Sequence, residues 1–234
     1  MQGALIHIQG HWAQFRKPET NNTPLTHDFL TKTAFIGLIG AVLGIERDEL
    51  RKLYPSLCDS LLYGVQVRCA VKKVSWAFTL RNVHKPNDPL EKAPRQMEFL
   101  SNPNYTVVLG LQDETSRDIF QRFVNAVQKS EACYTPVLGL HNCPAELAWI
   151  GDTTFEQAQG KYVTKGFALR SHKLTIDASQ PVRMNFERIP TFQDSDWWNV
   201  PDRYREVVYS FNDGLVSMEG DHFLSREGDA WCLI

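Results

Sequence analysis

An almost wholly apolar segment, AFIGLIGAVLGI from Ala34 to Ile45, most constrains how this 234-residue chain can fold. It is shorter than the roughly 20 apolar residues that span a bilayer, so a folded protein has to bury it. Thr33 precedes it and can act as an N-cap, because its hydroxyl can accept from a free N–H in the first helical turn. Small residues recur four positions apart and form one stripe: Gly37, Gly40, Ala41 and Gly44. The pattern predicts a helix from Ala34 whose small-residue stripe lies close against a sheet.

The segments around this helix predict a βαββαβ order. Strands are expected at 4–8, at 63–81 as one long strand or two, at 105–111 and at 145–151, with a capped amphipathic helix at 115–130. Residues 82–94 contain three prolines and no periodicity, which favours a loop or a hairpin tip. This is the order of a ferredoxin-like domain and of RNA-recognition modules, although the aromatic signature of those modules is missing.

The chain beyond about residue 155 has a different pattern of short strands separated by Pro, Asn, Asp and Gly. We therefore predict an α+β fold with two parts. Residues 1–155 form the ferredoxin-like βαββαβ domain with a projecting β-hairpin around 78–104, and residues 156–234 form a β-rich C-terminal extension.

The net charge of −2 argues against binding nucleic acid by bulk electrostatics. It conceals a basic half, residues 1–110 with a balance of +4, and an acidic half, residues 111–234 with a balance of −6. The basic half is a candidate for gripping a polyanion, and the acidic half for facing other proteins. Charge alone favours the plainer interpretation that these are solvated strand faces.

Several classes of protein are disfavoured by missing patterns. The five cysteines are scattered without a C-x-x-C pair, so we expect no disulfide framework, no metal site and no cofactor. A phosphate-binding G-x-x-x-x-G-K-[ST] sequence is also missing, which does not support a nucleotide triphosphatase. We expect a cytoplasmic protein that contacts no membrane, because neither a signal peptide nor a membrane-spanning segment is recognisable.

Cations and hydroxyls gather where the polar loop meets the apolar helix. A helix N-terminus presents unpaired N–H groups and the positive end of the helix dipole, so it can hold an anion. Thr31, Lys32 and Thr33 lie at this end, and the chain between the first strand and the helix adds four more candidates: Trp12, Phe15, Arg16 and Lys17. The two aromatic rings are candidates for stacking on unpaired bases. The plainer alternatives are that both rings belong to the core, that Thr33 only caps and that the cations are solvated.

Catalysis has one weaker candidate, the neighbours His84 and Lys85 in the predicted hairpin tip. A metal-independent ribonuclease needs a proton acceptor, a donor and a cation near one phosphate. Adjacent His and Lys are common by chance, so the pair is the alternative to a chain with no catalytic residues.

Three stretches resemble the Cas five family, the CRISPR-associated RAMP proteins of Cascade-type surveillance complexes. They are FRKPETNNTPLTHDFLTKTAFIGLIGAVLGI from Phe15, RQMEFLSNPNYTVVLGL from Arg95 and YTPVLGLHNCPAEL from Tyr134, in the family's order. One departure is that relatives carry prolines and an aromatic before the helix, whereas this chain has HDFLTKT from His27 to Thr33. Asp28 thereby places a negative charge near the predicted anion site.

The resemblance implies a non-catalytic subunit of a type I Cascade complex that holds the 5′ handle of CRISPR RNA (crRNA). It also implies that the projecting hairpin is the family's thumb, and that the partners are Cas seven backbone subunits, a large Cas eight type subunit and, indirectly, target DNA. It places Arg16, Lys17, Thr31, Lys32 and Thr33 near the handle, with His141 and Asn142 in a loop beside it. Arg95 and Gln96, at the return of the hairpin, are expected to meet RNA or the first backbone subunit.

Two alternatives to this function remain open. In one CRISPR subtype, members of the family cut the repeat themselves, which corresponds here to a metal-independent endoribonuclease using His84 and Lys85. The other alternative is a protein-only scaffold whose basic half pairs with an acidic partner.

Overall fold

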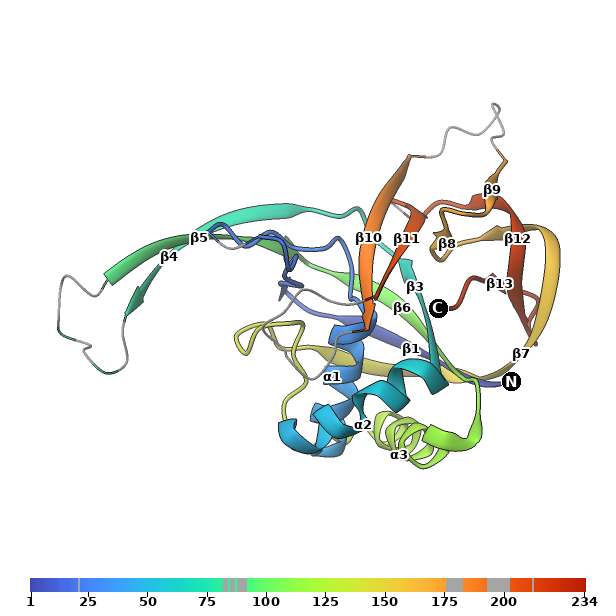
Figure 1. Ribbon diagram of the computed structural model, residues 1–234, viewed down its shortest axis with the longest axis horizontal. Helices are drawn as coiled ribbons and strands as arrows, with labels where there is room; N and C mark the ends of the chain where they lie inside the picture. Colours follow the sequence, from blue (N-terminus) through green and yellow to red (C-terminus); the bar gives the residue numbers. More distant parts are fainter. Residues whose placement is uncertain are drawn as a thin grey trace.

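The computed structural model describes residues 1–20, 22–81, 84, 87, 92–175, 183–192, 203–211 and 213–234. Three helices lie on one face of a curled antiparallel sheet, a long hairpin projects from one side, and a smaller β-rich part stands on the other (Figure 1). No helix within the described residues is long and apolar enough to cross a membrane.

The central sheet has the strand order β13-β12-β7-β1-β6-β3, with β9 joined to β12. Its strands are β1 (Gln2–Gln9), β3 (Leu61–Val67), β6 (Asn104–Leu111), β7 (Glu146–Thr164), β9 (Lys173–Leu174), β12 (Val216–Ser225) and β13 (Ala230–Trp231). Neighbouring strands are antiparallel throughout. The predicted strands at 4–8 and 105–111 are confirmed, and the predicted strand at 145–151 continues for 13 residues past Gly151 to Thr164 as β7.

Two smaller sheets have three strands each. One is the projecting hairpin of β4 (Lys73–Arg81) and β5 (Lys92–Ser101), joined at its base by β2 (Trp12–Ala13). The other has the order β10-β11-β8, from β10 (Met184–Phe192), β11 (Arg203–Ser210) and β8 (Ala168–Leu169). The segment 63–81 is thus two strands, and β5 begins inside the predicted 82–94 loop, most of which lies outside the described residues.

The helix α1 (Lys32–Leu43) starts earlier than predicted. Its N-cap is Thr31, whose hydroxyl accepts from the backbone N–H of Ala34, so the prediction of Thr33 as cap is wrong by two residues. Thr33 instead lies in the first turn, and its hydroxyl is 3.0 Å from that of Thr31. The helix ends at Gly44, whose φ of +69° is left-handed and favours glycine.

Within the glycine stripe of α1, Gly40 packs against another helix and not against the sheet as predicted. A Cβ at Gly40 would lie 2.7 Å from Cδ2 of Leu50 on α2 (Arg47–Ser60), whereas a Cβ at Gly37 would meet nothing within 4 Å. The close approach of α1 to α2 therefore favours glycine at position 40, whereas position 37 has room for a side chain. The third helix, α3 (Arg117–Gln128), follows the short 3-10 turn η2 (Glu114–Ser116) and buries Phe120, Phe123 and Val127 as its apolar spacing predicts.

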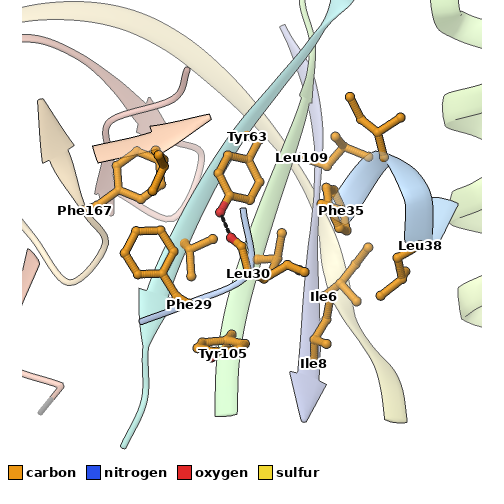
Figure 2. Packing of buried hydrophobic residues seen from close by; sticks show 14 of the residues in the cluster. Ile6, Ile8, Phe29, Leu30, Phe35, Leu38, Tyr63, Tyr105, Leu109 and Phe167 are labelled. Carbon is orange, nitrogen blue, oxygen red and sulfur yellow. Dashed lines mark hydrogen bonds between the residues drawn. The ribbon is translucent and has the colours of Figure 1, made fainter. Parts of the chain in front are cut away.

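The main core lies between the helices and the sheet. β1 contributes Ile6 and Ile8, and α1 contributes Phe35 and Leu38, while Phe29 and Leu30 enter from the chain just before α1 (Figure 2). The hydroxyl of Tyr63 on β3 donates to the carbonyl of Leu30, which fixes the start of the helix to the sheet. The end of the polar loop is therefore part of the core.

Candidate RNA-binding junction

Three predicted segments meet at β2. Trp12 and Ala13 pair with Ser101 and Leu100 of β5, and the backbone N–H of Gln14 donates to the carbonyl of Leu138 at 3.0 Å. The chain leaving β1, the base of the projecting hairpin and the loop at 137–144 thus form one continuous region. We call it the β2 junction, residues 12–17, 95–101 and 137–144.

An aromatic ladder runs from the junction along one face of the hairpin: Trp12, Trp76, Phe78 and Phe99. Ring centroids are 4.3 Å apart for Trp12 and Trp76, and 5.6 Å apart for Trp76 and Phe99. Trp76 is 37% exposed, and Trp12 is half-buried. Sequence reasoning missed Trp76 and Phe78, whose alternation in SWAF was the available signal.

The predicted residues Arg95 and Gln96 lie on β5, both exposed. Arg95 pairs in register with Phe78, so it shares the face of the aromatic ladder, whereas Gln96 pairs with Ala77 on the opposite face. A cation therefore lies beside aromatic rings on the hairpin, which is the combination that binds unpaired nucleotides.

Within the junction, the loop carrying His141 and Asn142 packs tightly against the chain at Gln14. Its hinge is Gly139, with φ of +92°, where a Cβ would lie 1.9 Å from the carbonyl oxygen of Gln14. Only glycine permits this approach. Both predicted side chains are exposed, while Cys143 is buried beneath them. Among the described residues, which include His141, no three or more His, Cys, Asp or Glu side chains are grouped so that they could hold a metal ion.

Phe15, Arg16 and Lys17, three consecutive residues of the predicted site, differ in exposure. Phe15 is 3% exposed and belongs to the core. Arg16 is exposed, and its guanidinium donates to the carbonyl of Thr20 at 3.2 and 3.3 Å. The ammonium of Lys17 lies 2.8 Å from Oε1 of Glu187 on β10. Of these three, Arg16 is the one whose side chain faces solvent.

Thr31 and Lys32, the predicted site residues at the N-terminus of α1, are buried and bonded to groups of the protein itself. The Lys32 ammonium donates to the carbonyls of Cys58 at 2.7 Å and Ile234 at 3.0 Å, and the residue is 4% exposed. Burial lowers the pKa of Lys32 from 10.5 to about 8. Thr31 is buried as well. Burial thus distinguishes Thr31 and Lys32 from the exposed residues of the β2 junction.

Asp28, the residue at odds with an anion site, is neutralised internally. Its Oδ1 lies 2.6 Å from the ammonium of Lys73 at the start of β4, and its Oδ2 accepts from Asn185 at 2.8 Å and from the hydroxyl of Tyr209. The carboxylate is buried, so its charge points into the fold and not toward a ligand. Asp28 therefore joins the polar loop, the hairpin base and the β10-β11 pair.

A second buried carboxylate, Glu187, completes this ionic cluster. Its Oε1 lies 2.8 Å from the Lys17 ammonium and 3.2 Å from Nδ1 of His27. Burial by itself would raise the pKa of Glu187, but the adjacent His27 imidazole and Lys17 ammonium outweigh it and lower the pKa to about 2. Oε1 of Glu98 lies 3.4 Å from the Lys73 ammonium. We define the ionic cluster as Lys17, His27, Asp28, Lys73, Glu98 and Glu187.

The candidate catalytic pair is only partly described. His84 is exposed in a turn of the hairpin tip, and Lys85 lies outside the described residues. The arrangement of the two side chains relative to each other therefore lies outside the described residues, and neither residue belongs to the β2 junction.

Fold and junction together define a class: a mixed α/β protein with a curled antiparallel sheet, few helices and a long hairpin that bears aromatic and cationic side chains. A family model described as CRISPR-associated protein (Cas_Cas5) matches residues 4–205. The chain belongs to this Cas five family.

Known proteins agree with this assignment. The chain is 26% identical over 151 residues to the CRISPR system Cascade subunit CasD of Escherichia coli K12, a match that covers 60% of this chain and 66%, just under two thirds, of that relative. Among solved structures, a CRISPR protein from Archaeoglobus fulgidus superposes with a TM-score of 0.62 at 15% identity, over 99% of this chain and 98% of that one. A chain of a CRISPR RNA-guided surveillance complex gives a TM-score of 0.54 at 12% identity, over 94% of this chain and 91% of that one. The structural likeness extends over both parts of the fold.

Proposed function

We propose that this protein is a non-catalytic subunit of a type I CRISPR Cascade complex that binds the 5′ handle of crRNA and caps the backbone of Cas seven subunits. Family membership and the Cascade relative support the complex. The observation that supports RNA binding at the level of residues is the meeting of three predicted segments at the β2 junction. The large Cas eight type subunit is the proposed neighbour beyond the handle.

The sheet order supports the corresponding fold. β7-β1-β6-β3 is the spatial order of a ferredoxin-like βαββαβ unit, with α1 and α2 after β1 and α3 after β6. The β4-β5 hairpin, inserted between β3 and β6, corresponds to the thumb. The boundary near residue 155 falls within β7, which continues unbroken into the second part, and the two-part division stays a prediction.

The exposed residues of the β2 junction and of the adjoining β4 have the chemistry for single-stranded RNA. Partly exposed indole rings at Trp12 and Trp76 offer stacking faces, and Arg16 and Arg95 offer charge to phosphates. Gln96, His141 and Asn142 add hydrogen-bonding groups at the surface. These residues form our proposed RNA contacts: Trp12, Arg16, Trp76, Arg95, Gln96, His141 and Asn142.

The buried members of the predicted set have a positioning role in this proposal. Phe15, Thr31 and Lys32 hold the polar loop and the helix end in place, and Lys17 and Thr33 are tied to protein groups. They act on RNA through the shape of the loop. Substituting them is expected to change folding before it changes RNA contacts.

A salt titration tests the proposal. Binding of an RNA containing the repeat from the chain's own CRISPR locus is followed by fluorescence anisotropy at several salt concentrations. Arg95→Ala should lower the log–log slope by about 0.7, because one phosphate contact is lost. Trp76→Ala should weaken binding by roughly 1–3 kcal/mol through lost stacking. Arg122→Ala, an exposed cation on α3, is the matched control, and equal effects of all three variants would contradict the proposed site.

The alternative function is separated by a cleavage assay. Labelled repeat RNA is incubated with the protein in EDTA, and we expect it to remain intact. Site-specific cleavage that disappears in His84→Ala would establish the ribonuclease in place of the non-catalytic subunit.

A further inference from the structure

The long strand β7 encloses a hollow on the face of the sheet opposite the helices. Its first half pairs with β1 and its second half with β12, and a bridge between Gly166 and Gln66 brings the chain after β7 back to β3. The resulting half-open hollow has a volume of about 280 Å³. Its lining residues come from β1, β3, β6, β7 and β13 and from the chain beside them; Figure 1 shows how β7 curves from β1 to β12.

Three exposed residues of the lining, which we call its rim, are apolar. Ile150 and Val163 on β7 and Leu215 before β12 line it, with 48%, 49% and 45% of their surface exposed. Only five other large hydrophobic residues of the described chain are comparably exposed, and none of those lines the hollow. Such gathering of apolar side chains on a surface marks a binding site.

Two cations share the hollow with this rim. Arg68 and Lys165 line it, and within the described residues neither side chain has an ion pair or a hydrogen bond. Asp229 is the acidic residue in the lining, and it forms no ion pair in the described part of the chain. The lining thus offers unpaired positive charge next to exposed aliphatic groups.

One wall of the hollow is fixed in position. The side-chain amide of Gln66 on β3 donates to Oδ1 of Asp213 at 2.6 Å, two residues before Leu215. Trp231 closes the floor and is 4% exposed, so its ring offers no open stacking face. The hollow is therefore preformed, which reduces the ordering cost of binding.

We propose that this hollow docks a segment of a partner protein that carries an aliphatic side chain next to carboxylates. The aliphatic side chain packs among Ile150, Val163 and Leu215, and the carboxylates pair with Arg68 and Lys165. The lining has no exposed aromatic plane for a base, and the partly exposed indole rings of Trp12 and Trp76 lie on β2 and β4, outside the lining. The chemistry therefore fits an acidic, aliphatic peptide better than RNA. This inference rests on the proposed function, since the partner is a subunit of the same complex.

Photo-crosslinking identifies what occupies the hollow. p-Benzoylphenylalanine replaces the exposed Val163, the complex is assembled in cells with the subunits of the same locus, and the irradiated product is sequenced by mass spectrometry. We expect a crosslinked peptide from another subunit with Asp or Glu within about two residues of Leu, Ile or Val. A crosslink to RNA, a crosslink to a peptide without acidic residues, or no crosslink in an assembled complex would overturn the inference.

A charge reversal supplies the second measurement. Arg68→Glu with Lys165→Glu should lower the crosslink yield about tenfold or more, because like charges then face the carboxylates. Lys52→Glu with Lys129→Glu makes the same change of charge on the helical side and should leave the yield unchanged. Equal yields from both double variants would overturn the inference. If guide RNA copurifies with the complex but no crosslink forms, the docking site alone is refuted. If the tagged chain recovers neither other subunits nor guide RNA, both the proposed function and the docking site are refuted.

Discussion

Asp28→Ala is the perturbation that most sharply tests whether the polar loop is internally tied or an open anion site. The substitution removes a buried carboxylate whose oxygens lie 2.6 Å from the Lys73 ammonium and 2.8 Å from Nδ2 of Asn185, and which also accepts from the Tyr209 hydroxyl. Removing one partner of a buried ion pair typically costs about 3–5 kcal/mol, because the other charge is left uncompensated. The Lys73 side chain is 29% exposed and has Glu98 at 3.4 Å, so we expect a loss of about 3 kcal/mol, at the lower end.

Urea unfolding followed by tryptophan fluorescence measures this loss. The midpoint should fall while the slope m stays unchanged, since the same surface is exposed on unfolding. Asp118→Ala is the matched control, because Asp118 pairs with Arg122 at 3.4 Å on the surface with 81% of its side chain exposed, and such pairs contribute about 0–1 kcal/mol. Unchanged stability of Asp28→Ala together with tighter RNA binding would refute the reasoning, since that is the behaviour of a repulsive charge in an open anion site.

Three further perturbations have expected outcomes. The pKa of Glu187 is lowered from 4.5 to about 2, so its contribution of about 3 kcal/mol should be complete above pH 5 and lost as the pH falls toward 2; Glu187→Gln should remove that part of the acid unfolding curve. Gly37→Ala should stabilise the protein by about 0.5–1 kcal/mol, whereas Gly40→Leu should destabilise it by about 1–3 kcal/mol through overlap with Leu50, and thermal unfolding of both variants checks the pair. The pKa of Lys32 is lowered to about 8, so the unfolded chain holds this proton more tightly; relative to Lys32→Met, the wild type should gain stability between pH 8 and 10, which urea unfolding at each pH measures.

The local elements could be predicted because their signals are local. β1, β6, α1 and α3 follow from apolar spacing within one segment, and their ends differ from expectation by a few residues. β7 continued past Gly151 because a register shift accommodates the chain there and glycine permits a φ of +123° at Gly160. Gly151 interrupts the alternating pattern in the sequence, but in the structure it lies beside a register shift within the single strand β7.

β10 is hard to locate from the sequence for a related reason. Its sequence MNFERIPTF contains Pro190, which reads as a breaker, but β10 is the edge strand of its three-stranded sheet, where proline is tolerated. Whether a strand lies at an edge depends on the tertiary order of strands. The sequence pattern alone carries no such information.

Contacts with residues distant in sequence tie some of the predicted site residues to the protein itself and leave others exposed. Lys17 meets Glu187 170 positions away, and the carboxylate of Asp28 meets Tyr209 181 positions away. A cation in a polar loop has the same local appearance whether it is solvated, ion-paired or bound to a ligand. Trp12 could be proposed from residue type, but its partner Trp76 follows only from the pairing of β2 with the hairpin.

Sequencing of the RNA that copurifies with the tagged protein from cells carrying its own CRISPR locus tests the central claim most directly. The account predicts guide RNAs with different spacers and one shared 5′ handle, recovered in lower yield from Arg95→Ala than from the Arg122→Ala control. An intact complex without RNA, or RNAs whose 5′ ends share no common sequence, would contradict it.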